Sequence, residues 1–488
     1  MRQDRSQLWT FLITGIAVFM VAMDNLVVTN ALPVIRVDLH TGLEGLEWTV
    51  NAYTLTFAVF LLTGAALGDR YGRRRLFTLG LALFTLASAA AAVAPDIQTL
   101  IAARAVQGLG GAIVTPLTLT LLADVVPAER RGTAFGLWGA MSGLGVALGP
   151  VIGGAVVEYA SWQWVFWINV PIGLALLPLS RALRESRGGA GRLDPIGVLL
   201  ATTGLFGVVF GLVRGGGHGW TDGTVLTGLI GGGLLVLAFL GWQRRAPHPM
   251  MPLHLYRSRG FSLANVVAFV MSFGVFGSVF LGAQFLQTVQ GYSPLAAGVR
   301  SLPWTALPAL VAPFSGRLAE RIGGRLVLAL SLVLQAVGIG WLSLVSRPDL
   351  PYSQLVAPFA VAGLGMGLFF APIARVTLGF APQHLAGVAS GTSNALRQLG
   401  TVLGIAVLGA IFSAAGGYAD GAQFVAGMRA GQFVGAVVLV GAALVALAIP
   451  NDRVPASAAL SDGAPAESAP AGGPAPVGGP VPAAAPAG

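Results

Sequence analysis

Two ionisable residues, Asp24 and Arg104, lie within long apolar stretches of the sequence. In a bilayer such side chains each cost about 3 kcal/mol or more, so they are the first candidates for a functional site. A carboxyl that interacts with a guanidinium can bind and release a proton as its surroundings change. We therefore predict that Asp24 couples protons and that Arg104 tunes it. The alternatives are a structural, hydrogen-bonded aspartate and an arginine that anchors its helix.

Other reactive groups are absent or dispersed. The 488 residues include no cysteine, which excludes disulfides, thiol nucleophiles and thiolate metal sites. All 28 basic residues are arginines, so the Gly-x-x-x-x-Gly-Lys-Ser/Thr phosphate loop cannot occur. The five histidines fall in predicted connections. We predict no catalytic residue, no metal site and no cofactor, and hence no enzyme.

The elements that must position Asp24 and Arg104 are membrane-spanning helices. Apolar residues make up 55% of the chain and charged residues 10%, and the mean hydropathy is +0.78. Fourteen apolar stretches are each about long enough to cross 30 Å of hydrocarbon. They lie near 8–30, 48–68, 76–95, 101–123, 135–157, 164–182, 195–213, 225–243, 261–286, 299–316, 326–345, 355–378, 391–414 and 431–449. This pattern predicts an all-α integral membrane protein, and the lipid bilayer is its surrounding partner.

The arginines indicate how the spans are oriented. With the N-terminus inside, twenty arginines fall on inward segments and five on outward segments. This bias predicts a multi-pass protein of the bacterial cytoplasmic membrane with both termini cytoplasmic, and it explains the basic charge without nucleic acid. Of the three arginines inside spans, Arg375 and Arg397 are expected to reach the cytoplasmic interface. A signal peptide is the less favoured reading of the first span.

An internal repeat divides the chain. The segment 67–74 recurs 251 residues later, and 127–149 recurs at an offset of 255 with nine of 23 positions identical. Two parallel repeats are typical of transporters in which two bundles rock about a central site. The repeat predicts an N-terminal six-helix bundle (1–182), a linker with two inserted helices (183–258), a C-terminal six-helix bundle (259–450) and a disordered cytoplasmic tail (451–488).

The segment GAALGDRYGRRR between the second and third spans resembles the cytoplasmic signature of the major facilitator superfamily. Over residues 8–450 the chain is similar to the fourteen-helix drug:proton antiporter branch of that superfamily, which is associated with multidrug and antibiotic efflux. The resemblance implies the major facilitator fold. It also implies a conformational latch made of Asp69, Arg70, Gly72, Arg73, Arg74 and Asp124, in which Arg73 or Arg74 reaches Asp124.

Three further segments carry the same resemblance. Residues 145–154 resemble the motif of exporting antiporters, with Gly145, Gly149, Pro150, Gly153 and Gly154; the second half has Ile405 where this motif has its proline. The segments around Asp24 and Arg104 resemble the motifs of the first and fourth spans, whose charged residues are implicated in proton transfer. Candidate substrate contacts in the cavity are Asn25, Tyr53, Gln107, Gln284, Gln287 and Asn394.

The function implied is proton-coupled export of amphipathic small organic molecules, such as drugs or antibiotics, by alternating access. The partners would be the small-molecule substrate and protons, with the proton motive force in place of a cofactor. Two alternatives stay open: export of one endogenous metabolite, or a membrane sensor that keeps the fold without transport. The sequence names neither the substrate nor an accessory protein.

Overall fold

The computed structural model describes residues 2–127, 130–188, 193–382 and 385–450. The regular elements in these ranges are helices, and no strand occurs among them. Within the described part of the chain, thirteen helices are long and apolar enough to cross a membrane, or fourteen if the bent pair Pro294–Arg300 and Leu302–Ile322 is one span. The predicted all-α membrane fold is confirmed. The predicted tail 451–488 lies outside the described residues.

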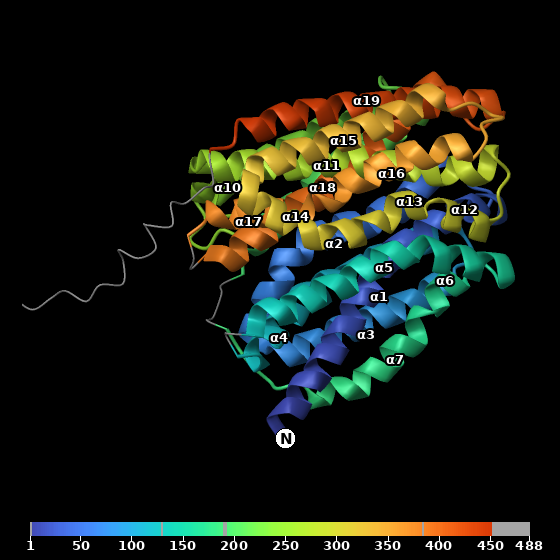
Figure 1. Cartoon of the computed structure of the whole chain (residues 1–488). Helices are drawn as coiled ribbons and strands as arrows, with labels where there is room; N and C mark the ends of the chain where they lie inside the picture. Colours follow the sequence, from blue (N-terminus) through green and yellow to red (C-terminus); the bar gives the residue numbers. More distant parts are fainter. Residues whose placement is uncertain (1, 128–129, 189–192, 383–384, 451–488) are drawn as a thin grey trace, which may run out of the picture. The chain divides into compact units, whose positions relative to one another are not determined.

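The first six spans are long helices whose ends alternate between two faces (Figure 1). They are α1 (Arg2–Asp38), α2 (Leu43–Tyr71), α3 (Arg73–Ala92), α4 (Ile97–Val125), α5 (Arg131–Tyr159) and the broken helix α6 (Trp164–Trp167) with α7 (Asn169–Leu179), which ends in η2 (Ser180–Ala182). Helix α4 packs against α2 and α3, and α5 packs along α1. Asp24 and Arg104 therefore belong to one helical group.

An inserted hairpin follows these spans. It consists of α8 (Pro195–His218), α9 (Gly223–Leu226), the π-helical turn η3 (Thr227–Gly231) and α10 (Gly232–Gln243). Asp194 caps α8 through Gly197 N (2.8 Å) and accepts hydrogen bonds from Trp242 Nε1 (2.7 Å) and Gln243 Nε2 (2.6 Å). Burial raises the pKa of Asp194, but these hydrogen bonds outweigh it and the net pKa is lowered. The hairpin packs through α8 on both α2 and α18.

The second set of spans begins after η4 (Leu253–Arg257). It contains α11 (Arg259–Gln284) with η5 (Phe285–Val289), α12 (Pro294–Arg300), α13 (Leu302–Thr305), α14 (Leu307–Ile322), α15 (Gly324–Val345), α16 (Ser353–Gly367), α17 (Phe370–Gly379), α18 (Ala386–Ala415) and α19 (Gly421–Leu447). The tenth predicted span is bent by 43° between α12 and α13. Pro303 is the second residue of the second part, and proline favours such a break because it lacks the donor for the preceding turn.

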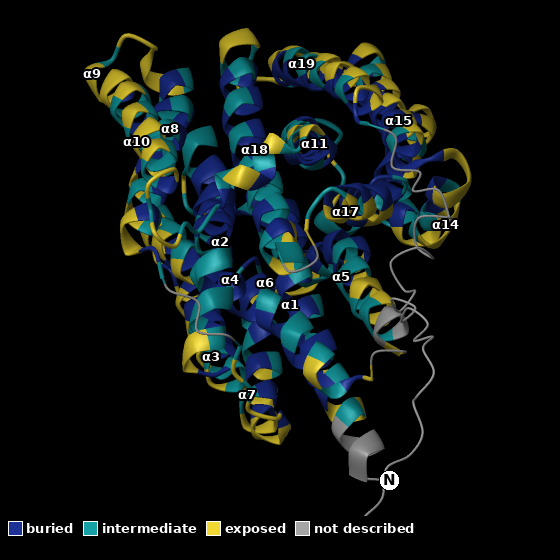
Figure 2. Cartoon of the chain, turned by 90° about the vertical axis from the view of Figure 1, so that its left-hand side faces the viewer, coloured by how far each residue is buried: buried dark blue, intermediate teal, exposed yellow. Residues whose placement is uncertain are grey.

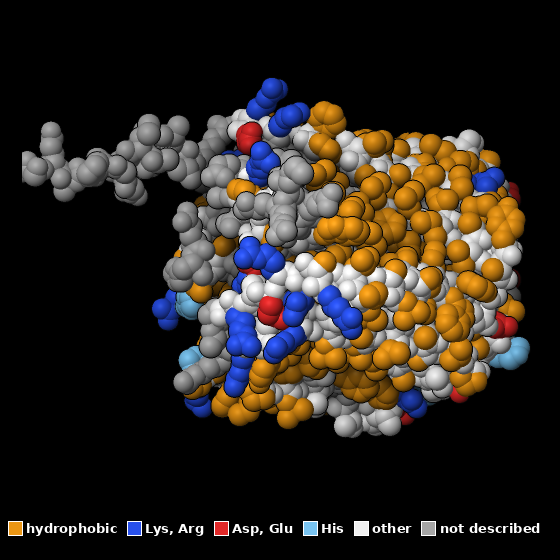
Figure 3. Space-filling view, turned by 90° about the horizontal axis from the view of Figure 1, so that it is seen from below, with side chains coloured by type: hydrophobic (Ala, Val, Ile, Leu, Met, Phe, Trp, Pro, Cys, Tyr) orange, Lys and Arg blue, Asp and Glu red, His pale blue; other side chains and the backbone are white. Residues whose placement is uncertain are grey.

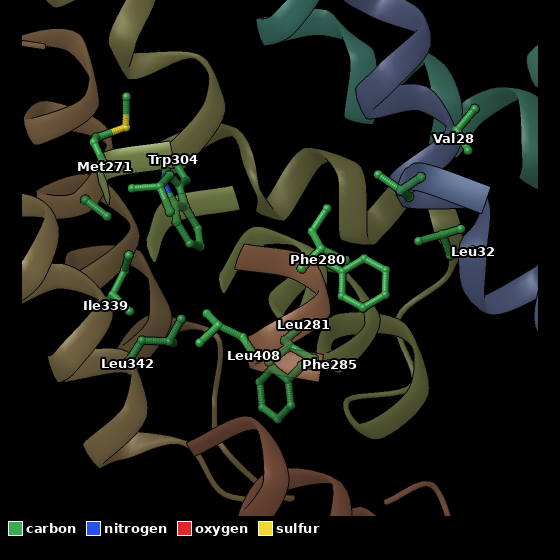
Figure 4. Packing of buried hydrophobic residues seen from close by; sticks show 14 of the residues in the cluster. Val28, Leu32, Met271, Phe280, Leu281, Phe285, Trp304, Ile339, Leu342 and Leu408 are labelled. Atoms are coloured by element: carbon green, nitrogen blue, oxygen red, sulfur yellow. The ribbon is translucent and has the colours of Figure 1, made fainter. Parts of the chain in front are cut away.

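The core joins the two sets of helices. One buried cluster contains residues of α1, such as Val28 and Leu32, together with Phe280 and Leu281 of α11. Figure 4 shows Phe280 on the side facing these α1 residues, and Leu281 beside Leu408 of α18. This packing places the junction of α1 and α11 at the centre of the molecule, where the predicted site belongs.

The surface shows the environment of the fold. Apolar side chains cover the middle of the face in Figure 3, and arginines gather at one end. That end, called the arginine-rich end below, contains Arg70 and Arg73 at the α2–α3 connection and Arg244 after α10. The opposite end contains the α1–α2 connection and the ends of α5 and α11. An apolar belt bounded by polar ends is what a bilayer requires.

Candidate functional site

The two charged residues predicted inside the spans contact each other. Arg104 Nη1 of α4 lies 2.5 Å from Asp24 Oδ2 of α1, and both side chains are 0% exposed. Asp24 Oδ1 also accepts hydrogen bonds from Gln107 Nε2 (2.9 Å) and Asn169 Nδ2 (2.8 Å). Three helices of the first set, α1, α4 and α7, thus meet at one carboxylate.

The arginine of this pair is held on several sides. Arg104 Nε donates to the carbonyl of Thr49 (3.1 Å), and Nη1 also donates to Gln107 Oε1 (2.6 Å). The ring of Tyr53 lies 4.3 Å from the guanidinium carbon. Arg104 Nη2 and the Tyr53 hydroxyl are buried and have no hydrogen-bond partner among the described residues. These are free polar atoms beside the carboxylate.

The geometry defines what this cluster can do. An ion pair without solvent is stable only if both charges remain hydrogen-bonded, and removing one charge leaves the other uncompensated. Protonation of Asp24 would remove its negative charge while Arg104 stays positive. The change in charge would therefore alter how α1, α4 and α7 hold together, which is the property required of a coupling residue.

The predicted latch lies at the arginine-rich end. Arg73 Nε lies 2.8 Å from Asp69 Oδ1, and Arg73 Nη1 lies 2.8 Å from Asp124 Oδ1. Gly72 has φ of 112°, a conformation that glycine adopts at little cost, between α2 and α3. Arg73, and not Arg74, is thus the residue that reaches Asp124. Arg70 stacks on the ring of Tyr71, with 5.3 Å to the centroid.

Residues after η2 complete this end of the latch, and no sequence motif predicts them. Glu185 accepts a hydrogen bond from the Arg74 amide (3.0 Å) and lies 3.6 Å from its Nε. The hydroxyl of Ser186 donates to Asp124. The amide of Gly188 donates to the carbonyl of Asp69 (3.1 Å). The start of the linker is therefore docked on the latch.

The predicted antiporter motif is a packing surface of α5. A Cβ built on Gly145 would lie 2.7 Å from the Phe19 carbonyl, and on Gly153 it would lie 2.9 Å from the Val27 carbonyl, both on α1. Gly149 faces Leu26 of α1 in the same way. Glycines at this spacing let two helix backbones approach closely. Together they hold α5 along the helix that carries Asp24.

The last part of the motif contacts the second set of helices. A Cβ on Gly154 would lie 2.3 Å from the carbonyl oxygen of Pro294, at the start of α12. The carbonyl of Pro150 accepts a hydrogen bond from Asn30 Nδ2 (3.0 Å), and Asn30 Nδ2 also donates to Pro294 O (3.1 Å). Glu158 accepts from the Leu295 amide (2.9 Å). The two sets are therefore closed against each other at the opposite end.

Two small pockets lie where α1 faces α11. The larger has a volume of about 40 Å³ and is lined by Leu26, Thr29, Asn30, Pro150 and Trp304 among others. Asn25, Thr29, Phe276 and Thr401 line the smaller one. A volume of about 40 Å³ holds only a few water molecules. The space between α1 and α11 is therefore small in this conformation. Trp304 Nε1 is buried there and has no hydrogen-bond partner among the described residues.

The six predicted substrate contacts are distributed over several places. Asn25 lines the smaller pocket. Gln107 donates to Asp24, and the ring of Tyr53 lies against Arg104. Gln284 accepts a hydrogen bond from the Tyr418 hydroxyl, and Gln287 Nε2 donates to the Asn30 carbonyl (2.8 Å), both toward the opposite end. Asn394 Oδ1 accepts from Arg397 Nη2 (2.5 Å). Their role in binding stays a prediction.

A second buried carboxylate escaped the sequence analysis. Glu47 of α2 is 1% exposed, and its Oε1 has no hydrogen-bond partner among the described residues. A Cβ built on Gly409 of α18 would lie 1.6 Å from this oxygen. Glu47 therefore fills the space that glycine leaves between α2 and α18. It lies one residue before the second predicted span, 48–68, so the search for charges inside spans does not find it.

The comparisons with known proteins agree with this geometry. The family model of the Major Facilitator Superfamily matches residues 14–405, and a second, overlapping match covers 266–478. The chain belongs to the Major Facilitator Superfamily. It is a multi-pass membrane transporter and not an enzyme.

The relatives place the chain in the drug-efflux branch of the superfamily. It is 36% identical over 414 residues to the multidrug resistance protein Stp of Mycobacterium tuberculosis (strain CDC 1551 / Oshkosh), covering 84% of this chain and 77% of that protein. It is 35% identical over 421 residues to the tetracenomycin C resistance and export protein of Streptomyces glaucescens, with 84% and 77% covered.

A solved structure confirms the fold independently. A bacterial homologue of the human lysosomal transporter Spinster, in an inward-facing and unoccupied conformation, superposes with a TM-score of 0.64 at 17% identity. The match covers 91% of this chain and 97% of that one. The predicted major facilitator fold is thus confirmed. The exact bundle boundaries stay predictions.

Proposed function

We propose that this transporter exports amphipathic small organic molecules, such as drugs or antibiotics, in exchange for protons. The observation that carries the proposal is the buried Asp24–Arg104 pair, whose Oδ2–Nη1 distance is 2.5 Å. Gln107 and Asn169 hold the same carboxylate. A carboxylate at the junction of three helices, in the drug-efflux branch, is suited to link protonation to helix rearrangement.

The orientation of the cycle follows from the arginines. We assign the arginine-rich end to the cytoplasm, with both termini there, because arginines favour the cytoplasmic side. The contacts of Asn30, Gly154 and Glu158 then close the outer end. In this state substrate would enter from the cytoplasm or the inner leaflet. After the bundles rock and substrate leaves outward, a proton from outside neutralises Asp24 and favours the return.

The proton motive force is sufficient for this work. One proton provides about 2.3 kcal/mol per 100 mV of membrane potential and about 1.4 kcal/mol per pH unit. A tenfold concentration ratio of a neutral substrate requires about 1.4 kcal/mol. A single proton per cycle therefore supports accumulation well above tenfold without ATP.

Dye uptake into everted membrane vesicles tests the proposal. The vesicles, acidified inside by respiration, are offered two dyes of opposite charge, ethidium and carboxyfluorescein. We expect the wild-type protein to accumulate at least one dye, and we expect an uncoupler or Asp24→Asn to abolish this accumulation. Asp349→Asn is the matched control, because Asp349 has an 88% exposed side chain far from the pair in sequence.

Two results would contradict the proposal. One is that neither dye accumulates above vesicles that lack the protein. The other is accumulation that persists when the proton gradient is collapsed. Uptake that depends on the gradient but survives Asp24→Asn would retain proton-driven export and would refute only the assignment of Asp24.

A further inference from the structure

Four polar residues form a row along one face of α18: Ser390, Asn394, Arg397 and Thr401. Their spacings of four, three and four residues place them above one another on a helix. Ser390 is exposed, Asn394 and Arg397 are partly buried, and Thr401 is 4% exposed. The row therefore leads from the arginine-rich end into the interior.

The inner end of this row is the centre of the transporter. Thr401 lines the smaller pocket together with Asn25 of α1 and Phe276 of α11. The outer side of this region is closed by the α5–α12 contacts described above. Figure 2 views the molecule from the arginine-rich end, with α18, α17, α5 and α1 around its middle. Gly387 of α18 and Gly139 of α5 are exposed, and no atom lies within 4 Å of a Cβ built on either.

Arg397 is a cation without a counter-charge on this route. Its Nη2 donates to Asn394 Oδ1 (2.5 Å), and its guanidinium carbon lies 5.7 Å from the Phe370 ring centroid of α17. It makes no ion pair with a carboxylate in the described ranges. Arg375, by contrast, lies 3.9 Å from Glu320, and its side chain is 44% exposed. Arg397, however, lies about three turns into α18 and is not placed at the interface.

The two buried carboxylates of the described spans make no hydrogen bond or ion pair with this row. Asp24 is neutralised by Arg104 at 2.5 Å, and Glu47 is packed against Gly409. The polar row is also not a remnant of the internal repeat. At the offset of 255 the corresponding residues of α5 are Phe135, Gly139, Ser142 and Val146, and none of these carries a charge. The positive charge is therefore specific to the second half.

We propose that Arg397 is the binding group for the acidic function of the substrate, and that the exported molecules are amphipathic organic anions. The proposal deepens the export function and rests on it. A guanidinium binds a carboxylate or sulfonate through two parallel hydrogen bonds. Asn394 positions the guanidinium, and the Phe370 and Phe276 rings offer apolar surface to the rest of the molecule. An organic cation would be repelled by Arg397 and would meet no free carboxylate in the described part of the route.

The proposal has an electrical consequence. When one singly charged anion leaves and one proton enters, each cycle moves two positive charges inward. At 100 mV, inside negative, the membrane potential then contributes about 4.6 kcal/mol per cycle. Exchange of a monovalent cation for one proton would be electroneutral and would not respond to the potential.

Matched xanthene dyes test the substrate class. Carboxyfluorescein carries negative charge and rhodamine 123 positive charge on the same ring system. Dye binding to purified protein is measured by fluorescence anisotropy, and uptake is measured in everted vesicles with and without a potential clamped by valinomycin and potassium. The variants are Arg397→Gln, Arg397→Lys and, as the control, Arg429→Gln, which removes an exposed arginine of α19.

We expect carboxyfluorescein to bind and to be transported, with uptake increased by the potential. Arg397→Gln should weaken carboxyfluorescein binding at least tenfold. Arg397→Lys should weaken it less, and Arg429→Gln should leave the affinity unchanged. The proposal is overturned if rhodamine 123 is the better substrate, if Arg397→Gln binds carboxyfluorescein as tightly as wild type, or if neither dye binds. If the proton gradient drives rhodamine 123 transport equally in wild type and Arg397→Gln, this inference is refuted and proton-driven export is retained. If the proton gradient drives transport of neither dye, both the inference about Arg397 and the proposed proton-driven export are refuted.

Discussion

Replacing Asp24 by asparagine should destabilise the fold as well as change transport. The substitution preserves the volume of the side chain but removes its charge, which leaves Arg104 buried at 0% exposure without a counter-ion. Asparagine also replaces one carboxylate oxygen by an NH2 group, which would face either Arg104 Nη1 or the two donors that bond Oδ1 in the wild type, Gln107 Nε2 and Asn169 Nδ2. Breaking one member of a buried ion pair costs about 3–5 kcal/mol. We expect a loss of this size for Asp24→Asn.

The assay is a double-mutant cycle with Arg104→Gln. Unfolding of the purified protein in mixed micelles is followed by the fluorescence of its ten tryptophans as the SDS fraction rises. Each single variant should lose stability, and the double variant should lose less than the sum by about 1–3 kcal/mol, because the second change removes the charge that the first left unpaired. Asp349→Asn, at an exposed side chain, serves as the control.

Two outcomes would refute this reasoning. If the two single losses add within about 0.5 kcal/mol, the residues do not interact energetically. If Asp24→Asn unfolds at the same SDS fraction as wild type, the carboxylate is not charged against Arg104 in the resting protein.

Three further predictions concern other parts of the molecule. Gly154→Val should prevent closure of the outer end, because its Cβ would lie 2.3 Å from the Pro294 carbonyl oxygen. Spin labels on cysteines introduced into this cysteine-free chain should report a longer distance between α5 and α12 than in the protein with Gly154. An unchanged distance would contradict this prediction. Arg73→Gln should abolish transport in the vesicle assay while changing unfolding by about 1 kcal/mol or less, and Arg73→Lys should not rescue it, because an ammonium cannot hold two carboxylates as a planar fork does. Asp194→Ala should lower the free energy of unfolding by about 1–3 kcal/mol in the SDS assay. Because the pKa of Asp194 is lowered in the fold, the stabilisation by its carboxylate should be present above about pH 4 and lost as the pH falls through the lowered pKa. Equal losses of stability at pH 3 and pH 6 would contradict this.

The sequence predicted the parts of the fold that depend on composition and charge. Length and hydropathy located the spans, and the repeat related the two halves. Asp24 and Arg104 could be paired in advance because a charge in hydrocarbon needs a partner. Arg73 or Arg74 could be joined to Asp124 because the segment between the second and third spans resembles the cytoplasmic signature of the superfamily.

The remaining contacts depend on how each helix is rotated about its axis. In lipid the outer face of a helix is as apolar as its inner face, so the periodicity does not say which side chains point inward. For this reason the sequence does not show that Gln107 holds Asp24, as it does in the structure. The hydropathy pattern also does not single out Glu47, which lies against Gly409, and it predicts an interfacial position for Arg397, which lies three turns into α18.

Reciprocal coupling in proteoliposomes tests the central claim most directly. Liposomes with no pH gradient are loaded with the dye that the protein exports and with a pH indicator of a different colour, and are then diluted into dye-free buffer. Because exchange runs in either direction, efflux of the dye must draw protons inward whichever way the protein is inserted. We predict that the lumen acidifies with wild-type protein and not with Asp24→Asn. Dye efflux through the wild-type protein without acidification would contradict proton antiport.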